Sequence, residues 1–421
     1  MKKNICIIGL GYVGLPLAFE FSKYHNVLGY DSNIKRINEL KKKKDTNKQV
    51  SKKFFYNSKI RFSSSEEDLK SCNVFIVTVP TPINKDKTPN LKPLKKASET
   101  ISKYLKKKDI VIFESTVYPG LTEEILVPIL RRKTNYNINK DFYIGYSPER
   151  ISPGDRKKVS EIKKVVSGSN AESSKIIYNL YKKIIKAGVY LAPNIKTAEA
   201  CKILENIQRD VNISLMNEAS IIFNKLSIDT FEVLKAANTK WNFLNFTPGL
   251  VGGHCISVDP YYMKYKAEKI GLKTQVISSG RNINESMVNN ICSRILKSKN
   301  FKKNKSFKSI GIMGLTFKEN CSDCRNSQVF KIIDFFLNRK FNVEVLDPKV
   351  NYSELNKKYR NLIVKKFSNK KDCLILAVPH KEFLNLKESD YHKKLKNKSI
   401  IFDVKNKLFL KQKKNYQILS L

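Results

Sequence analysis

The stretch GGHCISVD (residues 252–259) brings together side-chain types that can do chemistry. His254 and Cys255 are adjacent, and Asp259 follows the cysteine by four residues. Three uses fit this spacing: a nucleophilic thiol, half of a metal site, or a small core residue beside a glycine turn. A single Cys–His pair does not separate these uses, so other parts of the chain have to decide.

The remaining histidines and cysteines bear on the metal alternative. His25, His380 and His392 lie outside recognisable motifs, so no histidine cluster for a catalytic metal is expected. Cys321 and Cys324 form a CxxC pair, but zinc would need two further ligands at suitable spacing, and none is nearby. We interpret the pair as two reduced thiols without a shared role; a redox pair is the alternative.

A glycine motif near the start of the chain predicts a dinucleotide site. Gly9, Gly11 and Gly14 form a GxGxxG pattern between a short apolar run and an amphipathic stretch. The first glycine permits a tight turn, the second lets the backbone approach a pyrophosphate, and the third lets a helix pack on a strand. Asp31 ends the next apolar run, where a carboxylate can bind the ribose and would repel a 2′-phosphate. The motif therefore predicts NAD rather than NADP.

Alternating apolar runs and helix-like stretches provide the elements that position these residues. Strands are expected in NICIIGLG at the start and at 26–31, 73–80 and 110–116, and again at 309–317, 343–347, 373–379 and 400–403. Strands that alternate with helices in this way predict doubly wound parallel sheets. The chain therefore reads as two Rossmann-like halves, related by duplication or by convergence.

The middle of the chain differs from both halves. Residues 194–227 contain no glycine or proline and predict a helix of several turns, a kind of element that commonly offers a dimer surface. The lysine-rich stretch 296–309 is interpreted as a charged linker into the last domain. Residues 314–327 occupy the turn that corresponds to the glycine motif but carry Lys318, Asp323 and Arg325. A second phosphate-bearing ligand is therefore expected there.

Length and charge limit the class of protein. A chain of 421 residues predicts two or three domains, and 41% hydrophobic residues suffice for globular packing. The formal charge of +42 fits either a nucleic-acid or lipid-binding patch or a lysine-rich solvated surface. We favour the solvated surface because the longest lysine run is residues 41–44 and no aromatic-interleaved basic stripe is present. No nucleic-acid partner is expected.

Two further features indicate the compartment. The eight cysteines are scattered, as is typical of reduced thiols in the cytosol. Glu20 and three glycines interrupt the N-terminal apolar run, which predicts neither a signal peptide nor a membrane span. A cytoplasmic protein without membrane insertion is expected.

Seven stretches taken together resemble one known family. They are IGLGYVGLPLA near the start, VPTP (79–82), ESTVYPG (114–120), SPER (147–150), AEACKILEN (198–206), GGHC (252–255) and GLTFKENCSDCRNS (314–327). In this order they resemble the UDP-glucose/GDP-mannose dehydrogenase family over nearly the whole chain. SPERISPGD and GGHCISVDPYY are similar to UDP-N-acetylhexosamine 6-dehydrogenases of capsule and Vi-antigen-type polysaccharide pathways. Val258 stands where UDP-glucose enzymes usually have lysine.

The resemblance implies a four-electron oxidation of a sugar C6 alcohol to a carboxylate, with two NAD reduced per sugar. It makes Cys255 the nucleophile, which forms a thiohemiacetal and then a thioester that water hydrolyses. It implies Lys202 and Asn206, one helical turn apart, as groups that stabilise oxyanion charge. Asp259 and Glu149 would handle water and protons, without an assignment of which is the base.

The resemblance also implies the binding residues. Those expected at the cofactor are Gly9, Gly11, Tyr12, Val13, Gly14, Asp31, Pro80, Thr81, Thr116 and Arg325, with Thr116 also near the reacting water. Those expected at the substrate are Glu149, Arg150, Lys202, Asn206, Arg281, Phe317 and Lys318. Asn282 replaces the second of two arginines often found in this family segment, which leaves Arg281 alone to meet the nucleotide phosphates.

The expected fold class is α/β, with two Rossmann-like doubly wound parallel-sheet domains joined by a helical middle domain with one long central helix. Its parts are an NAD-binding domain (1–193), a central domain that carries the Cys255 loop (194–300) and a UDP-sugar-binding domain (301–421). A homodimer through the central helix is expected. The alternatives are a UDP-glucose or UDP-ManNAc 6-dehydrogenase with the same mechanism, or a non-catalytic regulator that binds a nucleotide sugar and NAD.

Overall fold

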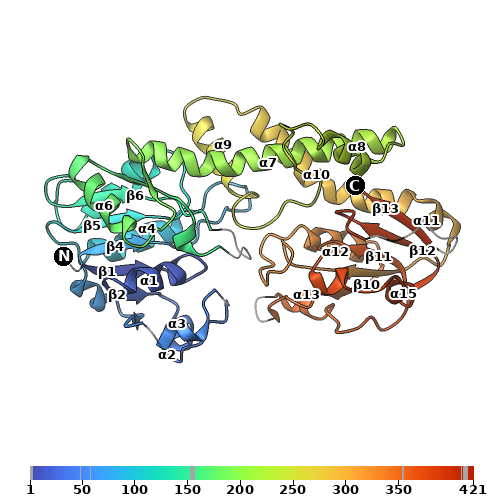
Figure 1. Cartoon of the computed structure of the whole chain (residues 1–421), viewed down its shortest axis with the longest axis horizontal. Helices are drawn as coiled ribbons and strands as arrows, with labels where there is room; N and C mark the ends of the chain where they lie inside the picture. Colours follow the sequence, from blue (N-terminus) through green and yellow to red (C-terminus); the bar gives the residue numbers. More distant parts are fainter. Residues whose placement is uncertain are drawn as a thin grey trace. The chain divides into compact units, whose positions relative to one another are not determined.

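The computed structural model describes residues 3–47, 49–56, 58–151, 157–352, 355–408, 410 and 416–421. The chain forms two compact units. The first comprises residues 1–205 and 261–273, and the second comprises residues 206–260 and 274–421. Figure 1 traces the first unit mainly in blue and green and the second mainly in yellow to red. Residues 152–155, the second half of the predicted motif SPERISPGD, lie outside the described residues.

The first unit is built on an eight-stranded sheet with the order β3-β2-β1-β4-β5-β6-β7-β8. Its strands are β1 (Asn4–Ile8), β2 (Asn26–Tyr30), β3 (Arg61–Ser63), β4 (Val74–Val77), β5 (Ile110–Phe113), β6 (Tyr143–Tyr146), β7 (Lys164–Gly168) and β8 (Val189–Leu191). Every residue of β4 and β5 is buried, as are the last four of β1. Continuous apolar runs of this kind form central parallel strands, which helices cover on both faces.

Helices connect these strands. They are α1 (Gly14–Ser22), α2 (Ile34–Lys41), α3 (Lys52–Tyr56), η1 (Glu66–Ser71), α4 (Lys92–Ser102), η2 (Thr122–Leu126), α5 (Val127–Arg131), η3 (Val159–Glu161) and α6 (Ala171–Lys182). Leu15 and Ala18 of α1 pack with Ile7 of β1 and Ile76 of β4 in the core of this unit. The apolar face of α1 therefore fixes the turn that precedes it.

One pairing departs from the expected parallel arrangement. Strand β7 runs antiparallel to β6, with Gly145 opposite Gly168 and Tyr146 opposite Ser167. An antiparallel return needs no helical crossover. The described part of the connection between these strands accordingly contains only the short helix η3.

The second unit carries a five-stranded, wholly parallel sheet with the order β10-β9-β11-β12-β13. Its strands are β9 (Ser309–Met313), β10 (Asn342–Leu346), β11 (Lys371–Leu376), β12 (Leu395–Asp403) and β13 (Tyr416–Ser420). Its shorter helices are α8 (Thr230–Ala237), α11 (Lys299–Lys303), α12 (Val329–Leu337), α13 (Lys357–Arg360), α14 (Lys381–Leu384) and α15 (Glu388–His392). The eight predicted strands are all present, and the predicted α/β fold class is confirmed.

Three longer helices complete the chain: α7 (Ile195–Lys225), α9 (Asp259–Lys269) and α10 (Val276–Lys297). Helix α7 is the predicted long central helix. In the second unit Asn217 of α7 donates hydrogen bonds to Gly249 and to Asn284 of α10. This polar contact ties the two helices to the chain that leads into the cysteine loop.

The predicted linker at 296–309 has more structure than expected. It contains the end of α10 and the whole of α11, and it lies inside the second unit. The hydroxyl of Ser298 accepts the N–H of Phe301 and so caps α11. The lysine content gave no sign of this cap. The predicted domain boundaries stay predictions.

Candidate active site

The turn between β1 and α1 has the geometry of a dinucleotide-binding turn. Gly9 has φ +93°, a conformation that other residues rarely adopt. A Cβ on Gly14 would lie 1.9 Å from the backbone oxygen of Gly9, so only glycine lets α1 approach the strand this closely. A Cβ on Gly11 would meet nothing within 4 Å. The middle glycine thus faces open space, as close approach of a pyrophosphate requires. Tyr12 and Val13, half-buried, complete the turn.

Asp31 is fixed at the end of β2 beside this turn. Its Oδ2 accepts the N–H of Leu10 at 2.8 Å, and its Oδ1 accepts the N–H of Asn33 at 2.9 Å. The carboxylate is therefore oriented by backbone donors before any ribose binds. These residues fit NAD, which would supply a hydride acceptor at this edge of the sheet.

Two hydroxyl groups join the carboxyl ends of the neighbouring strands. Thr78 Oγ1, after β4, donates to the oxygen of Gly9 at 2.7 Å. Ser115 Oγ, after β5, donates to the oxygen of Val79 at 2.7 Å. The half-buried Thr116 follows Ser115 directly, and Pro80 and Thr81 follow Val79. The fold therefore brings these predicted cofactor residues to the same sheet edge as the glycine turn.

A buried ionic cluster joins the carboxyl ends of β5 and β6 to the start of β7. Lys164 Nζ donates to Glu114 at 2.6 Å and to Glu149 at 2.9 Å, and Tyr181 donates a short hydrogen bond to Glu114. Burial raises the pKa of Glu114 to about 7 despite Lys164. Burial also tends to raise the pKa of Glu149, but Lys164 and the N–H of Ile151 outweigh it and lower that pKa. Glu149 is therefore held ionised.

Lys202 of α7 contacts the loop after β6, which carries Glu149. Its Nζ donates to the backbone oxygen of Glu149 at 2.5 Å, and the residue as a whole is 7% exposed. The predicted substrate residue Arg150 pairs with Glu205 of α7 at 2.6 Å. The structure thus brings the predicted residues Glu149, Arg150 and Lys202 together. The function of each stays a prediction.

The cysteine loop is packed on the loop that follows β9. A Cβ on Gly252 would lie 2.7 Å from the oxygen of Asn326, and one on Gly253 would lie 2.8 Å from the ring of Phe317. Both glycines are therefore required by close packing. Asn326 also donates to the oxygen of Gly253 at 3.1 Å. Cys255, half-buried, follows two residues later.

The residues after Cys255 start helix α9. The backbone oxygen of Cys255 accepts the N–H groups of Val258 and Asp259 at 3.0 and 2.8 Å. Asp259 is 1% exposed, and its Oδ2 accepts Asn206 Nδ2 at 2.5 Å. The second unit therefore holds the predicted nucleophile, the predicted aspartate and the predicted asparagine in one region. Lys202 lies one turn before Asn206 on α7.

Charged residues fix the loop 314–327 from within. Asp323 accepts the guanidinium of Arg325 at 2.9 and 3.0 Å and lies 3.4 Å from His254 Nδ1. Burial tends to raise the pKa of Asp323, but His254 and Arg325 together lower it well below its usual range. His254 is thus paired with the carboxylate of Asp323, which supports a role of His254 in shaping the loop. Lys318 is half-buried.

Arg281 has surroundings different from those expected, whereas those of Cys321 agree with its interpretation as a reduced thiol. The guanidinium of Arg281 is 3% exposed and donates to Asp210 at 2.6 Å, so its predicted phosphate contact stays a prediction without support from this geometry. Cys321 is a buried reduced thiol that donates to the oxygen of Lys318, and burial raises its pKa. Among the described residues, no group of three His, Cys, Asp or Glu side chains is arranged to hold a metal ion.

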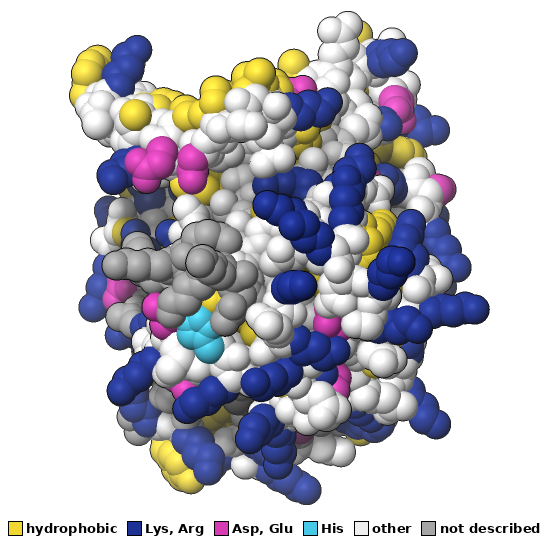
Figure 2. Space-filling view, turned by 90° about the vertical axis from the view of Figure 1, so that its right-hand side faces the viewer, with side chains coloured by type: hydrophobic (Ala, Val, Ile, Leu, Met, Phe, Trp, Pro, Cys, Tyr) yellow, Lys and Arg dark blue, Asp and Glu magenta, His cyan; other side chains and the backbone are white. Residues whose placement is uncertain are grey.

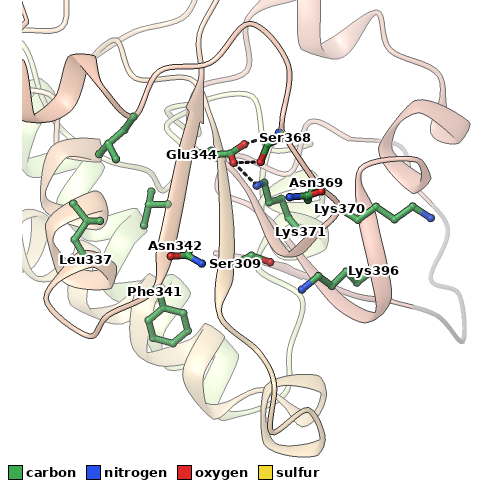
Figure 3. Close-up of a pocket in the computed structure, with 12 residues that line it drawn as sticks. Ser309, Leu337, Phe341, Asn342, Glu344, Ser368, Asn369, Lys370, Lys371 and Lys396 are labelled. Atoms are coloured by element: carbon green, nitrogen blue, oxygen red, sulfur yellow. Dashed lines mark hydrogen bonds and ion pairs between the residues drawn. The ribbon is translucent and has the colours of Figure 1, made fainter.

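A groove of about 850 Å³ lies at the end of the second sheet opposite the loop 314–327 (Figure 3). It lies where β9, β10 and β11 begin. Three of its twelve lining residues are lysines, against 80 Lys and Arg in 421, so it is hardly more basic than the chain as a whole. Lys371 is paired with Glu344, and Lys396 with Asp372. The groove carries none of the predicted site residues.

On the face drawn in Figure 2, the positive charge is likewise diffuse. Figure 2 shows lysine and arginine side chains scattered over one face, with acidic and uncharged side chains between them, rather than gathered into one stripe. This distribution supports the interpretation of a solvated basic surface. In the described part of the chain, no helix combines the length and hydropathy that a membrane span requires.

Some residues of the site were missed by sequence reasoning. Glu199 of α7 accepts the N–H groups of Gly120 and Thr122 at 2.6 and 3.0 Å and so ties the loop after Thr116 to this helix. Glu199 stands three residues before Lys202 in the stretch AEACKILEN (198–206), so this stretch could have indicated it as a site residue. Lys164 lay in no motif.

The fold and these contacts fit an enzyme that binds a dinucleotide such as NAD. Models of three domains of one family match the chain in order: the NAD binding domain at residues 3–185, the central domain at 196–286 and the UDP binding domain at 311–409. The chain belongs to the UDP-glucose/GDP-mannose dehydrogenase family, as its motifs had predicted, and it is an NAD-dependent nucleotide-sugar dehydrogenase.

Individual relatives agree along the whole chain. UDP-N-acetyl-D-glucosamine 6-dehydrogenase of Salmonella typhi is 47% identical over 407 residues, 96% of each chain. A protein of the same name from Pseudomonas aeruginosa is 48% identical over 406 residues, again 96% of each chain. The structure of the UDP-D-ManNAc dehydrogenase from Pyrococcus horikoshii has a TM-score of 0.85, with 28% identity, over 99% of this chain and 98% of that one.

Proposed function

We propose that the protein oxidises the C6 alcohol of a UDP-N-acetylhexosamine, UDP-GlcNAc or UDP-GalNAc, to the uronate, for surface polysaccharide biosynthesis. The proposal is supported by the identity of 47–48% with two relatives named for UDP-GlcNAc 6-oxidation. The structural observation that carries it is the nearly buried Asp259, hydrogen-bonded to Asn206, four residues after Cys255. A carboxylate kept this close in sequence to a thiol suits an acyl-enzyme that water must hydrolyse.

The chemistry requires two oxidations at the same carbon. The glycine turn and Asp31 would hold NAD, which would supply the hydride acceptor for each oxidation. After the first, the Cys255 thiolate adds to the C6 aldehyde and forms a thiohemiacetal, whose carbon still carries a hydrogen. Loss of that hydrogen as hydride, with the hydroxyl proton passing to a base, leaves a thioester. Water hydrolyses the thioester, releasing the uronate and the thiol.

Charged and amide groups would support these steps. Lys202 and Asn206 would stabilise negative charge on the C6 oxygen, since cationic and N–H donors aimed at a developing oxyanion lower the barrier. Asp259 would take up protons at the attacking water. Lys164 keeps Glu149 ionised. Glu149 would either handle protons and water as a second carboxylate beside Asp259, or hold the loop whose backbone orients Lys202. Phe317 and Lys318 would contact the nucleotide sugar.

Assembly and location form a second part of the proposal. Leu215 and Ile222 of α7 are 56% and 50% exposed, and Leu226, directly after α7, and Trp241 are 63% and 92% exposed. Apolar side chains exposed at helical spacing support a homodimer through α7. Reduced thiols at Cys6, Cys72, Cys201, Cys292, Cys321 and Cys373 support a cytoplasmic location.

The proposed reaction is tested by the NADH formed per sugar, with UDP-GlcNAc, UDP-GalNAc, UDP-ManNAc and UDP-glucose in limiting amounts. About two NADH per acetamido sugar, with uronate as product, is the expected result. One NADH per sugar would contradict the covalent role of Cys255. Oxidation of UDP-glucose or UDP-ManNAc alone would keep the mechanism and change the substrate. No NADH from any of them would favour the non-catalytic regulator.

A further inference from the structure

The second sheet repeats the local geometry of the dinucleotide turn. Gly314 directly follows β9 and has φ +92°, as Gly9 directly follows β1 and has φ +93°. Asp347 follows β10 as Asp31 follows β2, and in each half the residue after the glycine donates its N–H to that aspartate, at 2.6 Å and 2.8 Å. The two turns are therefore built in the same way.

A histidine distinguishes the second turn from the first. His380 follows β11, at the place where Thr81 follows β4, and it is 0% exposed. Its Nε2 lies 3.1 Å from Asp347 Oδ2 and 3.2 Å from Thr316 Oγ1. Asp31 is the carboxylate that could bind a ribose in the first half. Its counterpart in the second half, Asp347, instead contacts a side chain of the protein itself, His380.

The hydrogen bonds of His380 indicate its tautomer. The backbone N–H of Asn320 donates to Nδ1 at 2.9 Å, so this nitrogen carries a lone pair. The ring proton of the neutral imidazole is therefore on Nε2, where Asp347 and Thr316 can accept it. Asn320 in turn accepts the N–H of Lys381 through its side chain at 3.0 Å. One side chain thus connects the end of β11 to both ends of the segment 316–320.

This segment carries the residues expected to bind the nucleotide sugar. Phe317 donates its N–H to the oxygen of Asp323 at 3.1 Å, and its ring packs against Gly253. Lys318 accepts the Thr316 hydroxyl through its backbone oxygen at 2.9 Å. Displacement of Asn320 would therefore shift Phe317 and Lys318, and with them the contact to the cysteine loop.

We propose that His380 is a positioning residue for nucleotide-sugar binding: its Nδ1 tethers Asn320 and so fixes the segment that carries Phe317 and Lys318. The inference rests on the proposed function for the role of these two residues. The inference goes beyond the proposed function because it assigns a specific hydrogen bond to a histidine outside every family motif.

Two substitutions separate the hydrogen bonds of the ring. His380→Asn keeps an acceptor near the position of Nδ1 but is too short to reach Asp347. His380→Gln keeps a donor near the position of Nε2 but offers no acceptor at Nδ1. His392→Gln, which removes a partly exposed histidine paired with Glu388, is the matched control. The readouts are KM for the UDP-sugar, KM for NAD, and the Kd for UDP measured by calorimetry.

The loss of this partly buried hydrogen bond is expected to weaken binding by about tenfold. His380→Gln should therefore raise the KM for the UDP-sugar and the Kd for UDP by about tenfold, with the KM for NAD unchanged. For His380→Asn, both KM values and the Kd for UDP should stay within about threefold of the wild-type values. His392→Gln should have the wild-type values.

Three results would overturn the inference: a wild-type Kd for UDP in His380→Gln, an equal rise of both KM values, or a loss in His380→Asn as large as in His380→Gln. If His380→Gln does not fold, a wild-type KM for the sugar in His380→Asn is still required. If the wild type oxidises no UDP-sugar, the proposed function fails, while the Kd for UDP in the two variants still tests His380. A wild type that does not bind UDP would contradict both.

Discussion

The side-chain amide of Asn206 lies 2.5 Å from a carboxylate oxygen of Asp259, a residue that is 1% exposed. This contact joins α7 to the first turn of α9, which follows the cysteine loop. A buried carboxylate with an amide donor is fixed in direction, so it can act on a water or a proton at one position only. The relationship makes Asn206 a residue that orients Asp259 as well as a candidate oxyanion donor.

Removal of this amide is expected to slow turnover more than it weakens binding. Asn206→Ala should lower kcat by about 10- to 1000-fold, because both a donor to Asp259 and a transition-state donor are lost. The KM for NAD should stay unchanged. Asn212→Ala, which replaces a half-buried asparagine on the same helix whose amide donates to the backbone oxygen of Gln208, is the matched control. Steady-state kinetics with the preferred UDP-sugar would measure both, and a change in KM alone would contradict a role in the reaction.

Replacement of the nucleophile is expected to abolish uronate formation. Cys255→Ala should reduce net oxidation to the acid by about 1000-fold or more, because no thioester can form. NAD affinity should be preserved, since the glycine turn is untouched. Cys201→Ala, a half-buried thiol bonded to Glu205, should keep its activity. Uronate production by Cys255→Ala at the wild-type rate would refute the covalent mechanism.

The glycine turn allows folding and cofactor binding to be separated. Gly14→Ala places a Cβ 1.9 Å from the oxygen of Gly9 and should lower the melting temperature by several degrees. Gly11→Ala meets nothing within 4 Å in the protein, so it should fold normally and lose NAD affinity. Thermal unfolding without ligand and NAD titration would measure the two effects. Normal NAD binding by Gly11→Ala would contradict the position of the pyrophosphate.

Lys164 should be required for stability. Lys164→Met leaves Glu114 and Glu149 buried without their cation, and the breaking of a buried ion pair costs about 3–5 kcal/mol of unfolding free energy. The double variant Lys164→Met/Glu114→Gln removes one of the unpaired carboxylates and should recover part of this loss. Urea unfolding at neutral pH would measure both. Equal stability of the wild type and the single variant would show that the cluster is not tightly coupled.

Glu199 should impose a pH dependence on stability. Burial raises the pKa of this carboxyl to about 7 from an ordinary value of 4.5. The folded state therefore holds the proton more strongly than the unfolded state. Its contribution is fully present below pH 4.5 and is lost as the pH rises to 7, by about 3 kcal/mol at most.

The comparison with Glu199→Gln isolates this effect. The variant cannot titrate, so the unfolding free energy of the wild type relative to the variant should fall between pH 4.5 and 7. Urea unfolding at several pH values measures this difference. A difference that does not change with pH would contradict the shifted pKa.

Features within a few residues of one another could be predicted from the sequence. The GxGxxG spacing, Asp31, the eight strands and the long helix α7 were all predicted, because backbone sterics and apolar periodicity act over short distances along the chain. The spacing of Lys202 and Asn206 along α7, and the closeness of Asp259 to Cys255, are likewise set by covalent geometry. Family motifs added the nucleotide-sugar class.

Contacts between distant residues were decided only by the tertiary structure. Lys164 meets Glu114 from 50 residues away, and His380 meets Asn320 from 60 residues away. Neither pair has a local signal, since the partners meet only when the sheet forms: the antiparallel β7 brings its first residue, Lys164, to the carboxyl ends of β5 and β6, and the parallel β9 and β11 bring the loops after them together. The neighbours of each buried carboxyl group then determine its protonation: the pKa of Glu149 is lowered by Lys164, the N–H of Ile151 and Lys202, whereas burial raises the pKa of Glu114 to about 7 despite Lys164. Only the packing around each group sets which effect is larger.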